Sequence, residues 1–412
     1  MIKRLLYAFV AVILIAATLS SCGGNGVPAT SPTPDVSPSA EVSPSPTPEL
    51  SPSPSPVVSP TADPTLVAWN GAVEHVFFHT LITYPELAFH GPNAKGNDDW
   101  MVTVPEFNKI IQSLYDKNFI IVNMNDVWSE YTNANGAQRM KQNTLYVPAG
   151  KKPLIISFDD ISYYPSYIGD GYPTKLILGQ DGDIWAYAVD PRGNTVISQD
   201  IDAIPLLDRF IEEHPDFSLN GAKGMLCMTG YEGLFGYRTQ VNSYGNTPEE
   251  ETRRQAEILR VKPIIARLRE TGWYFASHTW GHINLGSASF ETLKADTKRW
   301  KDQVEPLLGS TTILVYPHGA RPDSSTGGDV WVNNAGTEVK WLLDQGFRMF
   351  CSVGPNYFTK IRDDVPALMC DRIDIDGIKL RGDPEKLIRF YDARLVWDDA
   401  RIVDNDKFKR AW

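Results

Sequence analysis

The stretch Leu-Ile-Ile-Ser-Phe-Asp-Asp at residues 154–160 ends a short apolar run with two adjacent acids. From about residue 70 onward, similar apolar runs alternate with amphipathic helical runs, an alternation typical of βα units around a mostly parallel sheet. The runs with the length and composition of strands are 76–78, 119–122, 154–158, 225–228, 273–277, 313–316, 349–353 and 368–373. Seven or eight such strands predict an α/β fold, a distorted (β/α)7-type barrel.

The helical runs carry recognisable start signals. Thr103 and Glu106 form a capping box before a run with helical spacing, and Thr247 and Glu250 form another. Pro263 lies inside the second of these helices, and its missing N–H and ring clash are expected to kink or split that helix. Between about residues 163 and 200 the alternation of strands and helices is interrupted. A strand-like alternation of side chains, flanked by glycines, predicts an inserted β-hairpin there.

The N-terminal residues predict export. Lys3 and Arg4 precede an apolar run over residues 5–19, which is too short and wrongly flanked for a lasting transmembrane helix. The run ends in Leu-Ser-Ser-Cys, which resembles a bacterial lipobox, so we expect a lipoprotein signal peptide over residues 1–21 and a lipid on Cys22. An ordinary signal peptide and an uncleaved anchor are the alternatives. All three place the rest of the chain outside the cytoplasm, and the first places it on the extracellular face of a bacterial membrane.

A Ser/Pro-rich segment follows the lipobox. Residues 28–64 are almost entirely Ser, Pro, Thr, Val, Ala and a few acids, a composition that cannot bury enough apolar surface to offset the entropy of ordering. We therefore expect a disordered, lipid-anchored linker over residues 22–70 and a globular domain over residues 71–412. A proline-rich docking ligand is the weaker alternative, because the segment lacks aromatic and basic anchors.

Charge and cysteine content narrow the class of protein. A net charge of −11 argues against nucleic-acid binding, which requires a basic face. Cys227, Cys351 and Cys370 lie in apolar stretches, so buried thiols are expected, with one disulfide and a free thiol as the alternative in an oxidising compartment. The absence of a Cys-x-x-Cys spacing disfavours a cysteine-based zinc site.

Polar residues fit for catalysis fall directly after the predicted strands. His79 follows the first strand, Asp159 and Asp160 the third, His278 and His282 the fifth, and the segment 317–319 the sixth. Barrels of parallel strands place their active sites on the face where the carboxyl ends of the strands meet. These four segments are therefore expected to converge on one site.

Asp159 and Asp160 need a special environment if they end a buried strand. Burying one carboxylate is costly and two adjacent ones repel, but a bound cation resolves both problems and leaves the second acid ionised as a base. The spacing of His278 and His282 puts both imidazoles on one face of a turn and permits shared metal ligation. A turn or helix cap for the acids and a solvated pair for the histidines are the alternatives.

Together these segments resemble the polysaccharide deacetylase family, also called the NodB homology or carbohydrate esterase 4 family. Asp159-Asp160 are similar to its first motif, and His278-Thr-Trp-Gly-His282 is similar to its H[ST]xxH motif. The resemblance implies that Asp159 is the catalytic base and that Asp160, His278 and His282 hold a divalent metal. Zinc is the expected metal, with cobalt, nickel and manganese as alternatives.

The first strand and its surroundings resemble the branch of the family that deacetylates poly-N-acetylglucosamine. In that branch the histidine of the first strand is the catalytic acid, which implies this role for His79. The third motif departs from the family pattern, since the segment Pro317, His318 and Gly319 has His where Tyr is usual. The implied role of His318 is to donate its backbone N–H to the oxyanion, and a change of side chain leaves this N–H in place. Arg372 and Asp374 resemble a late segment that supports the base or the acid, with an outer salt bridge as the alternative.

The implied function is metal-dependent N-deacetylation of an extracellular polysaccharide that contains N-acetylglucosamine. Exopolysaccharide, peptidoglycan and a chitin-like polymer are the candidate substrates, and acetate is the product. One alternative keeps the site but removes O-acetyl groups from xylan or a similar polymer. Another is a catalytically silent, carbohydrate-binding lipoprotein, although a pure binder needs no paired acids. The expected partners are thus a carbohydrate polymer and a membrane, with no nucleic acid.

Overall fold

The structure is a computed structural model that describes residues 65–322, 336–402, 410 and 412. Contacts divide the chain into residues 1–60 and 61–412, and the described residues belong to the second unit. The predicted signal peptide, Cys22 and nearly all of the predicted linker lie outside the described residues. Among the helices that the structure describes, none is long and apolar enough to cross a membrane.

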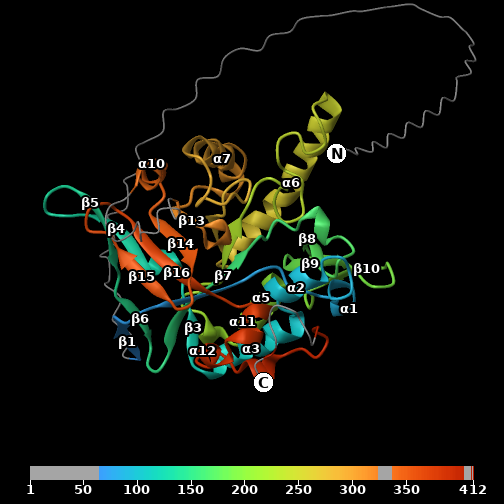
Figure 1. Ribbon diagram of the computed structural model, residues 1–412, viewed down its shortest axis with the longest axis horizontal. Coiled ribbons are helices and arrows are strands. Elements are labelled where there is room, and N and C mark those ends of the chain that lie inside the picture. The colour runs from blue at the N-terminus through green and yellow to red at the C-terminus, as the bar shows by residue number, and fades with distance from the viewer. Residues whose placement is uncertain (1–64, 323–335, 403–409, 411) are drawn as a thin grey trace, which may run out of the picture. The chain divides into compact units, whose positions relative to one another are not determined.

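A closed barrel of parallel strands forms the centre of the domain (Figure 1). Within the described ranges its seven strands are β2 (Glu74–Phe78), β7 (Lys152–Asp159), β11 (Met225–Met228), β12 (Tyr274–Ser277), β13 (Ile313–Val315), β14 (Met349–Val353) and β16 (Leu368–Asp374). They pair in the order β2-β7-β11-β12-β13-β14-β16, and β16 pairs with β2 to close the ring. The predicted α/β barrel is confirmed.

One of the eight predicted strands, β3 (Phe119–Ile121), lies beside the ring and is not a member of it. It pairs with the start of β7 at residues 152–154, whereas β11 pairs with the end of β7 at residues 157–159. One edge of β7 is thus shared between two strands, and an isolated bridge joins Ile121 to Ser218, just ahead of β11. This shared edge is the distortion of the barrel.

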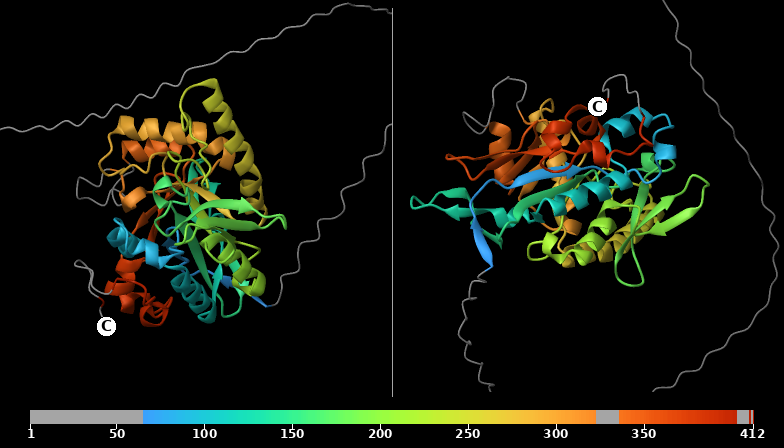
Figure 2. Two further views of the ribbon diagram at one scale, coloured as in Figure 1. Left: turned by 90° about the vertical axis from the view of Figure 1, so that its right-hand side faces the viewer. Right: turned by 90° about the horizontal axis from the view of Figure 1, so that it is seen from below.

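Helices connect the barrel strands and cover their outer faces (Figure 2). The longer ones are α3 (Val104–Asp116), α5 (Ala203–Glu213), α6 (Pro248–Glu270), α7 (Phe290–Gln303) and α10 (Thr337–Asp344). Both predicted capping boxes are present, at the starts of α3 and α6. Of the kink or split expected at Pro263, the split does not occur, since α6 continues through the proline. Val261 and Ile264 are buried on either side of it, and such packing supplies most of a helix's stability.

Short helices fill the connections near the two ends of the domain. They are α1 (Pro85–Ala88), α2 (Ala94–Trp100), α4 (Met124–Val127), α8 (Glu305–Leu308), α11 (Gly377–Gly382), α12 (Pro384–Leu387) and α13 (Ala393–Val396). Three-residue 3₁₀ turns occur at η1 (Pro165–Tyr167), η2 (Pro215–Phe217) and η3 (Pro317–Gly319). Two of these elements, α2 and η3, contribute residues to the cavity described below.

Antiparallel strands decorate the barrel. β8 (Pro173–Leu178), β9 (Ile184–Val189) and β10 (Thr195–Ser198) form a three-stranded sheet where the sequence predicted a hairpin. β4 (Trp128–Thr132) and β5 (Gln138–Gln142) form a hairpin, and these two sheets extend on opposite sides of the barrel (Figures 1 and 2). β15 (Phe358–Ile361) pairs with β16, and β1 (Leu66–Trp69) pairs with β6 (Leu145–Pro148). β1 begins at Leu66, close to the first described residue.

The side chains of the barrel strands alternate between inner and outer hydrophobic clusters. Ile156 and Phe158 of β7 pack with residues of the surrounding helices, such as Phe107 of α3. Ile155 packs instead with Cys227 and with alternate residues of the other barrel strands. Since successive side chains of a strand point to opposite faces, the second cluster fills the barrel interior. A filled interior leaves the carboxyl ends of the strands as the place for a ligand site.

Candidate active site

The carboxyl ends of the barrel strands surround a cavity of about 410 Å³. Its lining includes most of the predicted site residues, namely His79, Asp159, Asp160, His278, His282, His318, Gly319 and Asp374. The expected convergence of four separate segments of sequence is therefore found in the structure. Pro317 and Arg372 are buried directly beside the cavity.

Asp160, His278 and His282 bring three possible metal ligands together. Their ligand atoms all lie within 4.8 Å of one another. The Nε2 atom of His282 is 3.6 Å from Oδ2 of Asp160, and Nε2 of His278 is 4.0 Å from Oδ1 of Asp160. Nδ1 of His278 donates to the carbonyl oxygen of Val315 at 3.0 Å, which leaves Nε2 free as a ligand. Two imidazoles and one carboxylate are a donor set that suits zinc.

Backbone conformation turns these ligands toward the cavity. Asp160, Thr279 and His282 have φ values of 61°, 61° and 51°, in the left-handed region that non-glycine residues rarely adopt. Such residues cost on the order of 1–3 kcal/mol each and cluster at functional sites. The segment from His278 to His282 forms a bend rather than a helix, and it brings both imidazoles to the same side as Asp160. The carboxylate of Asp296 holds it by accepting the N–H groups of Trp280 and Gly281, both at 2.7 Å.

Asp159 is held by an arginine of β16, a strand that only β2 separates from β7 in the ring. Arg372 is fully buried and donates to the two carboxylate oxygens of Asp159 at 2.7 and 2.8 Å. Burial opposes ionisation of Asp159, but the Arg372 guanidinium outweighs it and holds the pKa of this acid below its usual value. Burial lowers the pKa of His278, 3.9 Å from Asp159, to about 4. The site therefore holds a carboxylate and a neutral imidazole at neutral pH.

His79 lies in the cavity beside two buried acids. Within the described residues, Nδ1 of His79 has no hydrogen-bond partner, and neither has Oδ1 of Asp374. The carboxyl groups of Asp374 and Asp376 hydrogen-bond to each other. Burial raises the pKa of both, and the neighbouring Asp376 raises that of Asp374 further. The pair therefore retains a proton close to His79. Asp376 also begins α11 by accepting the N–H of Lys379 at 2.7 Å.

His318 lies on the 3₁₀ turn η3, beside the cluster of Asp160, His278 and His282. Its φ of 58° and the φ of 63° at Gly319 make a tight reversal, and a Cβ at Gly319 would lie 2.9 Å from Val353. The rings of His318 and His282 meet edge to face with centroids 4.6 Å apart. Burial, with the neighbouring His282, lowers the pKa of His318. The imidazole thus contacts a predicted metal ligand, a feature that the sequence did not reveal.

Several residues that shape the site were missed by the sequence analysis. The hydroxyl of Tyr164 donates to Oδ1 of Asp160 at 2.6 Å, and Asp296 orders the histidine segment from α7. Asp376 carried a usable signal, because it is a second acid directly after the last barrel strand. Asp296 carried none, since its role depends on how α7 packs against the histidine segment, and Tyr164 carried none, since no local pattern gives the course of the loop after β7.

Comparison with known proteins places part of the chain in a family. Residues 235–329 match the family model described as polysaccharide deacetylase, a segment that contains His278, His282 and His318. No curated protein matches the chain in sequence. The Streptococcus pyogenes deacetylase PplD in complex with acetate aligns with a TM-score of 0.40 and 16% identity over 79% of this chain and 99% of that one. A putative polysaccharide deacetylase from Bacillus anthracis aligns with a TM-score of 0.39 and 13% identity over 76% of this chain and 66% of that one.

The family match and the site agree in detail. The matched segment runs from the loop before α6 to beyond η3, and it supplies both histidines of the presumed ligand cluster. The first motif, at Asp159 and Asp160, precedes the matched segment, and the fold brings it against those histidines. Residues 235–329, the part of the chain that carries His278, His282 and His318, are thus similar to the polysaccharide deacetylase family.

Proposed function

We propose that this protein is a metal-dependent N-deacetylase of an extracellular polysaccharide that contains N-acetylglucosamine. The observation that carries the proposal is the position of Asp159. This ionised acid, fixed by Arg372, lies against the cluster of Asp160, His278 and His282 in a single cavity. A carbohydrate-binding protein without activity would have no use for a buried base beside a metal site.

Asp160, His278 and His282 are the proposed metal ligands. Zinc suits their nitrogen and oxygen donors, and cobalt, nickel and manganese are alternatives. When bound, the metal would act as a Lewis acid toward the acetyl carbonyl and the attacking water. Asp160 is kept ionised for this role, because the neighbouring histidines lower its pKa against the opposing effect of burial.

Asp159 is the proposed general base. Its carboxylate would take a proton from water as the water oxygen attacks the acetyl carbonyl carbon. Arg372 keeps Asp159 ionised and fixes both of its oxygens, so the base needs no rearrangement to accept the proton. The backbone N–H of His318 would donate to the carbonyl oxygen as it gains negative charge.

His79 is the proposed general acid. As the carbon–nitrogen bond breaks, protonated His79 would give its proton to the departing nitrogen, leaving a free amino sugar and acetate. Asp374 lines the same cavity as His79, and Asp376 lies next to Asp374. Asp374 is thus proposed to support the acid, while Arg372 supports the base.

The chain's location follows from the proposed lipid anchor at Cys22. A polyproline II linker of about 37 residues at about 3.1 Å each could hold the domain on the order of 100 Å from the bilayer. This reach would suit a polymer of the cell surface or wall.

A substrate panel tests the proposal. Acetate and new amino groups would be measured with chito-oligomers, poly-β-1,6-N-acetylglucosamine, peptidoglycan and acetylxylan. We expect acetate and amine in equal amounts from at least one of the N-acetylated polymers. Acetate from acetylxylan alone would identify an O-acetyl esterase, and no acetate from any polymer would favour a silent binder.

A further inference from the structure

Trp100 is an exposed aromatic residue at the cavity that the proposed mechanism does not use. Its side chain lines the same cavity as His79 and Asp159, yet it is 50% exposed. Other large aromatics, such as Trp273 and Trp300, are almost fully buried. A single exposed aromatic is common and means little by itself. What distinguishes Trp100 is that buried side chains hold the backbone on both sides of it.

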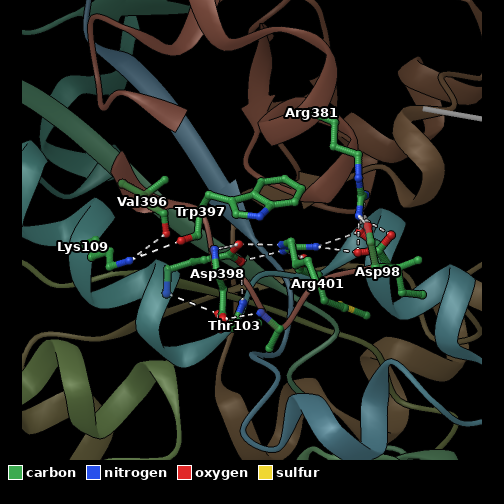
Figure 3. Close-up of polar contacts among 12 residues, drawn as sticks. Asp98, Thr103, Lys109, Arg381, Val396, Trp397, Asp398 and Arg401 are labelled. Atoms are coloured by element: carbon green, nitrogen blue, oxygen red, sulfur yellow. Dashed lines mark hydrogen bonds and ion pairs between the residues drawn. The ribbon is translucent and has the colours of Figure 1, made fainter. Parts of the chain in front are cut away.

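Two buried arginines hold the backbone on both sides of Trp100. Asp98 precedes it on α2, and its carboxylate is paired with both Arg381 and Arg401 (Figure 3). The main-chain oxygen of Asp98 accepts from Arg381 at 3.2 Å and from Arg401 at 2.9 Å. Arg401 also donates to the main-chain oxygen of Met101 at 2.6 Å. The carbonyl groups at positions 98 and 101 are thus anchored, with Trp100 between them.

The same cluster ties α2 to two other parts of the domain. Arg401 donates to both carboxylate oxygens of Glu106, in the first turn of α3, at 2.6 Å. At the start of α11, a Cβ on Gly377 would lie 1.8 Å from the main-chain oxygen of Asp98, so only glycine permits this approach. We call Asp98, Glu106, Arg381 and Arg401 the Asp98 cluster.

The Asp98 cluster is costly to bury and therefore calls for an explanation. Its four side chains are fully buried, and their two negative and two positive charges balance. Buried ion pairs contribute little net stability compared with apolar packing, but they define geometry strictly. The geometry defined here is the position of the last turn of α2, which presents Trp100 to the cavity.

We propose that Trp100 stacks on a sugar ring of the polymer next to the ring that loses its acetyl group, and that the Asp98 cluster positions Trp100 for this contact. The inference rests on the proposed function. A pyranose ring has an apolar C–H face that matches the face of an indole, and aromatic side chains supply contact area at a low cost in conformational entropy. The ligand class is therefore a polymer of at least two pyranose units.

Steady-state kinetics of Trp100→Ala and Trp100→Phe test the contact. The substrates are an N-acetylglucosamine hexamer and 4-nitrophenyl acetate, which carries no sugar ring next to its acetyl group. We expect Trp100→Ala to raise KM for the hexamer about ten-fold. Trp100→Phe should recover much of this loss, and both variants should hydrolyse 4-nitrophenyl acetate as the wild type does. An unchanged KM for the hexamer, or an equal loss on both substrates, would overturn the inference.

Tyr146→Ala is the matched control, because Tyr146 is 58% exposed on β6 and does not line the cavity. Arg381→Lys tests the positioning role, since lysine keeps the charge but cannot bond the carboxylate and the main-chain oxygen of Asp98 as a planar fork does. It should raise KM for the hexamer while leaving 4-nitrophenyl acetate hydrolysis unchanged. The positioning role is refuted if folded Arg381→Lys has the wild-type KM.

A binding measurement separates this inference from the proposed function. Calorimetry of the metal-free protein with the hexamer requires no turnover, so it decides the matter even if no polymer yields acetate. Trp100→Ala should weaken this binding about ten-fold relative to the wild type and to Tyr146→Ala. Equal dissociation constants, or no binding of the hexamer by the wild type, would overturn the inference.

Discussion

Asp159 occupies an environment that fits a base better than a structural acid. It is buried, yet both of its oxygens are held by Arg372, and it lies 3.9 Å from His278. Burying an ion pair so completely brings little net stability. Its value here is an acid that stays ionised in a fixed orientation beside the presumed metal ligands.

Asp159→Asn should therefore separate catalysis from metal binding. The amide is nearly isosteric but cannot accept the water proton, so acetate release should fall by about 10²–10⁴ while bound metal is retained. Metal content, acetate release and thermal unfolding would be measured together, because the change also weakens the pair with Arg372. The exposed Asp302, paired with Lys298 on α7, offers a matched Asp→Asn control. Full activity of Asp159→Asn would show that the base lies elsewhere.

Tyr164 should act through Asp160. Its hydroxyl donates to Oδ1 of Asp160 at 2.6 Å and so orients a presumed metal ligand. Loss of such outer partners commonly lowers metal affinity by about 10–100-fold. We expect this loss for Tyr164→Phe in a competition titration with a chelator, and no loss for Tyr146→Phe on the surface. Equal affinities would mean that the hydroxyl does not orient the ligand.

The residues that the sequence revealed share one property. Asp159, Asp160, His278 and His282 belong to short motifs that directly follow strands, so local sequence and barrel topology together place them. Asp296 and Trp100 are held in place by contacts between elements that are far apart in sequence, whereas Tyr164 lies four residues after Asp160 in the loop that follows β7. Their roles follow from packing, which no local pattern encodes.

At the scale of elements, α5 illustrates a buried acid whose state depends on pH. Asp202 precedes the first turn of the helix. Its carboxylate accepts hydrogen bonds from the N–H of Ile204 at 3.0 Å and from the hydroxyl of Tyr163 at 2.7 Å. Burial raises its pKa from 3.8 to about 6 against the opposing hydrogen bonds. Between these values the folded state keeps a proton that the unfolded state loses. The stability that this proton contributes is complete below about pH 4 and is lost as pH rises through about 6.

Asp202→Asn should remove this part of the pH dependence, because asparagine caps a helix but does not ionise. The unfolding free energy of the wild type should fall relative to the variant by up to about 3 kcal/mol between pH 4 and 7. Urea unfolding of both proteins across this range gives the difference. A constant difference between the two would contradict the raised pKa.

Strand and helix assignments show where sequence patterns stop being informative. All of the predicted strands exist, but the pattern could not show that β3 lies outside the ring, because closure depends on which parts of β7 pair with which neighbour. Similarly, the penalty of Pro263 is local, whereas the continuity of α6 depends on packing along its buried face. Long-range pairing and packing decided both cases.

For the whole molecule, the filled barrel predicts unreactive cysteines. Cys227, Cys351 and Cys370 are fully buried free thiols, with the sulfurs of Cys351 and Cys370 3.3 Å apart on adjacent strands. Burial raises the pKa of the Cys227 and Cys351 thiols, which disfavours the reactive thiolate. Peptide mapping after alkylation should find all three unmodified in the native protein and modified in denaturant. Labelling of the native protein would show that the interior opens, and an unlabelled pair in denaturant would reveal a disulfide.

The cluster of Asp160, His278 and His282 is the centre of the proposed function, and metal removal tests it most directly. The purified full chain would be stripped with a chelator, and acetate and free amine would be measured from an N-acetylglucosamine oligomer before stripping, after stripping and during titration with zinc. We expect the stripped protein to be inactive, and one equivalent of zinc to restore acetate and amine in equal amounts. Undiminished acetate release from protein shown to contain no metal would contradict the proposal.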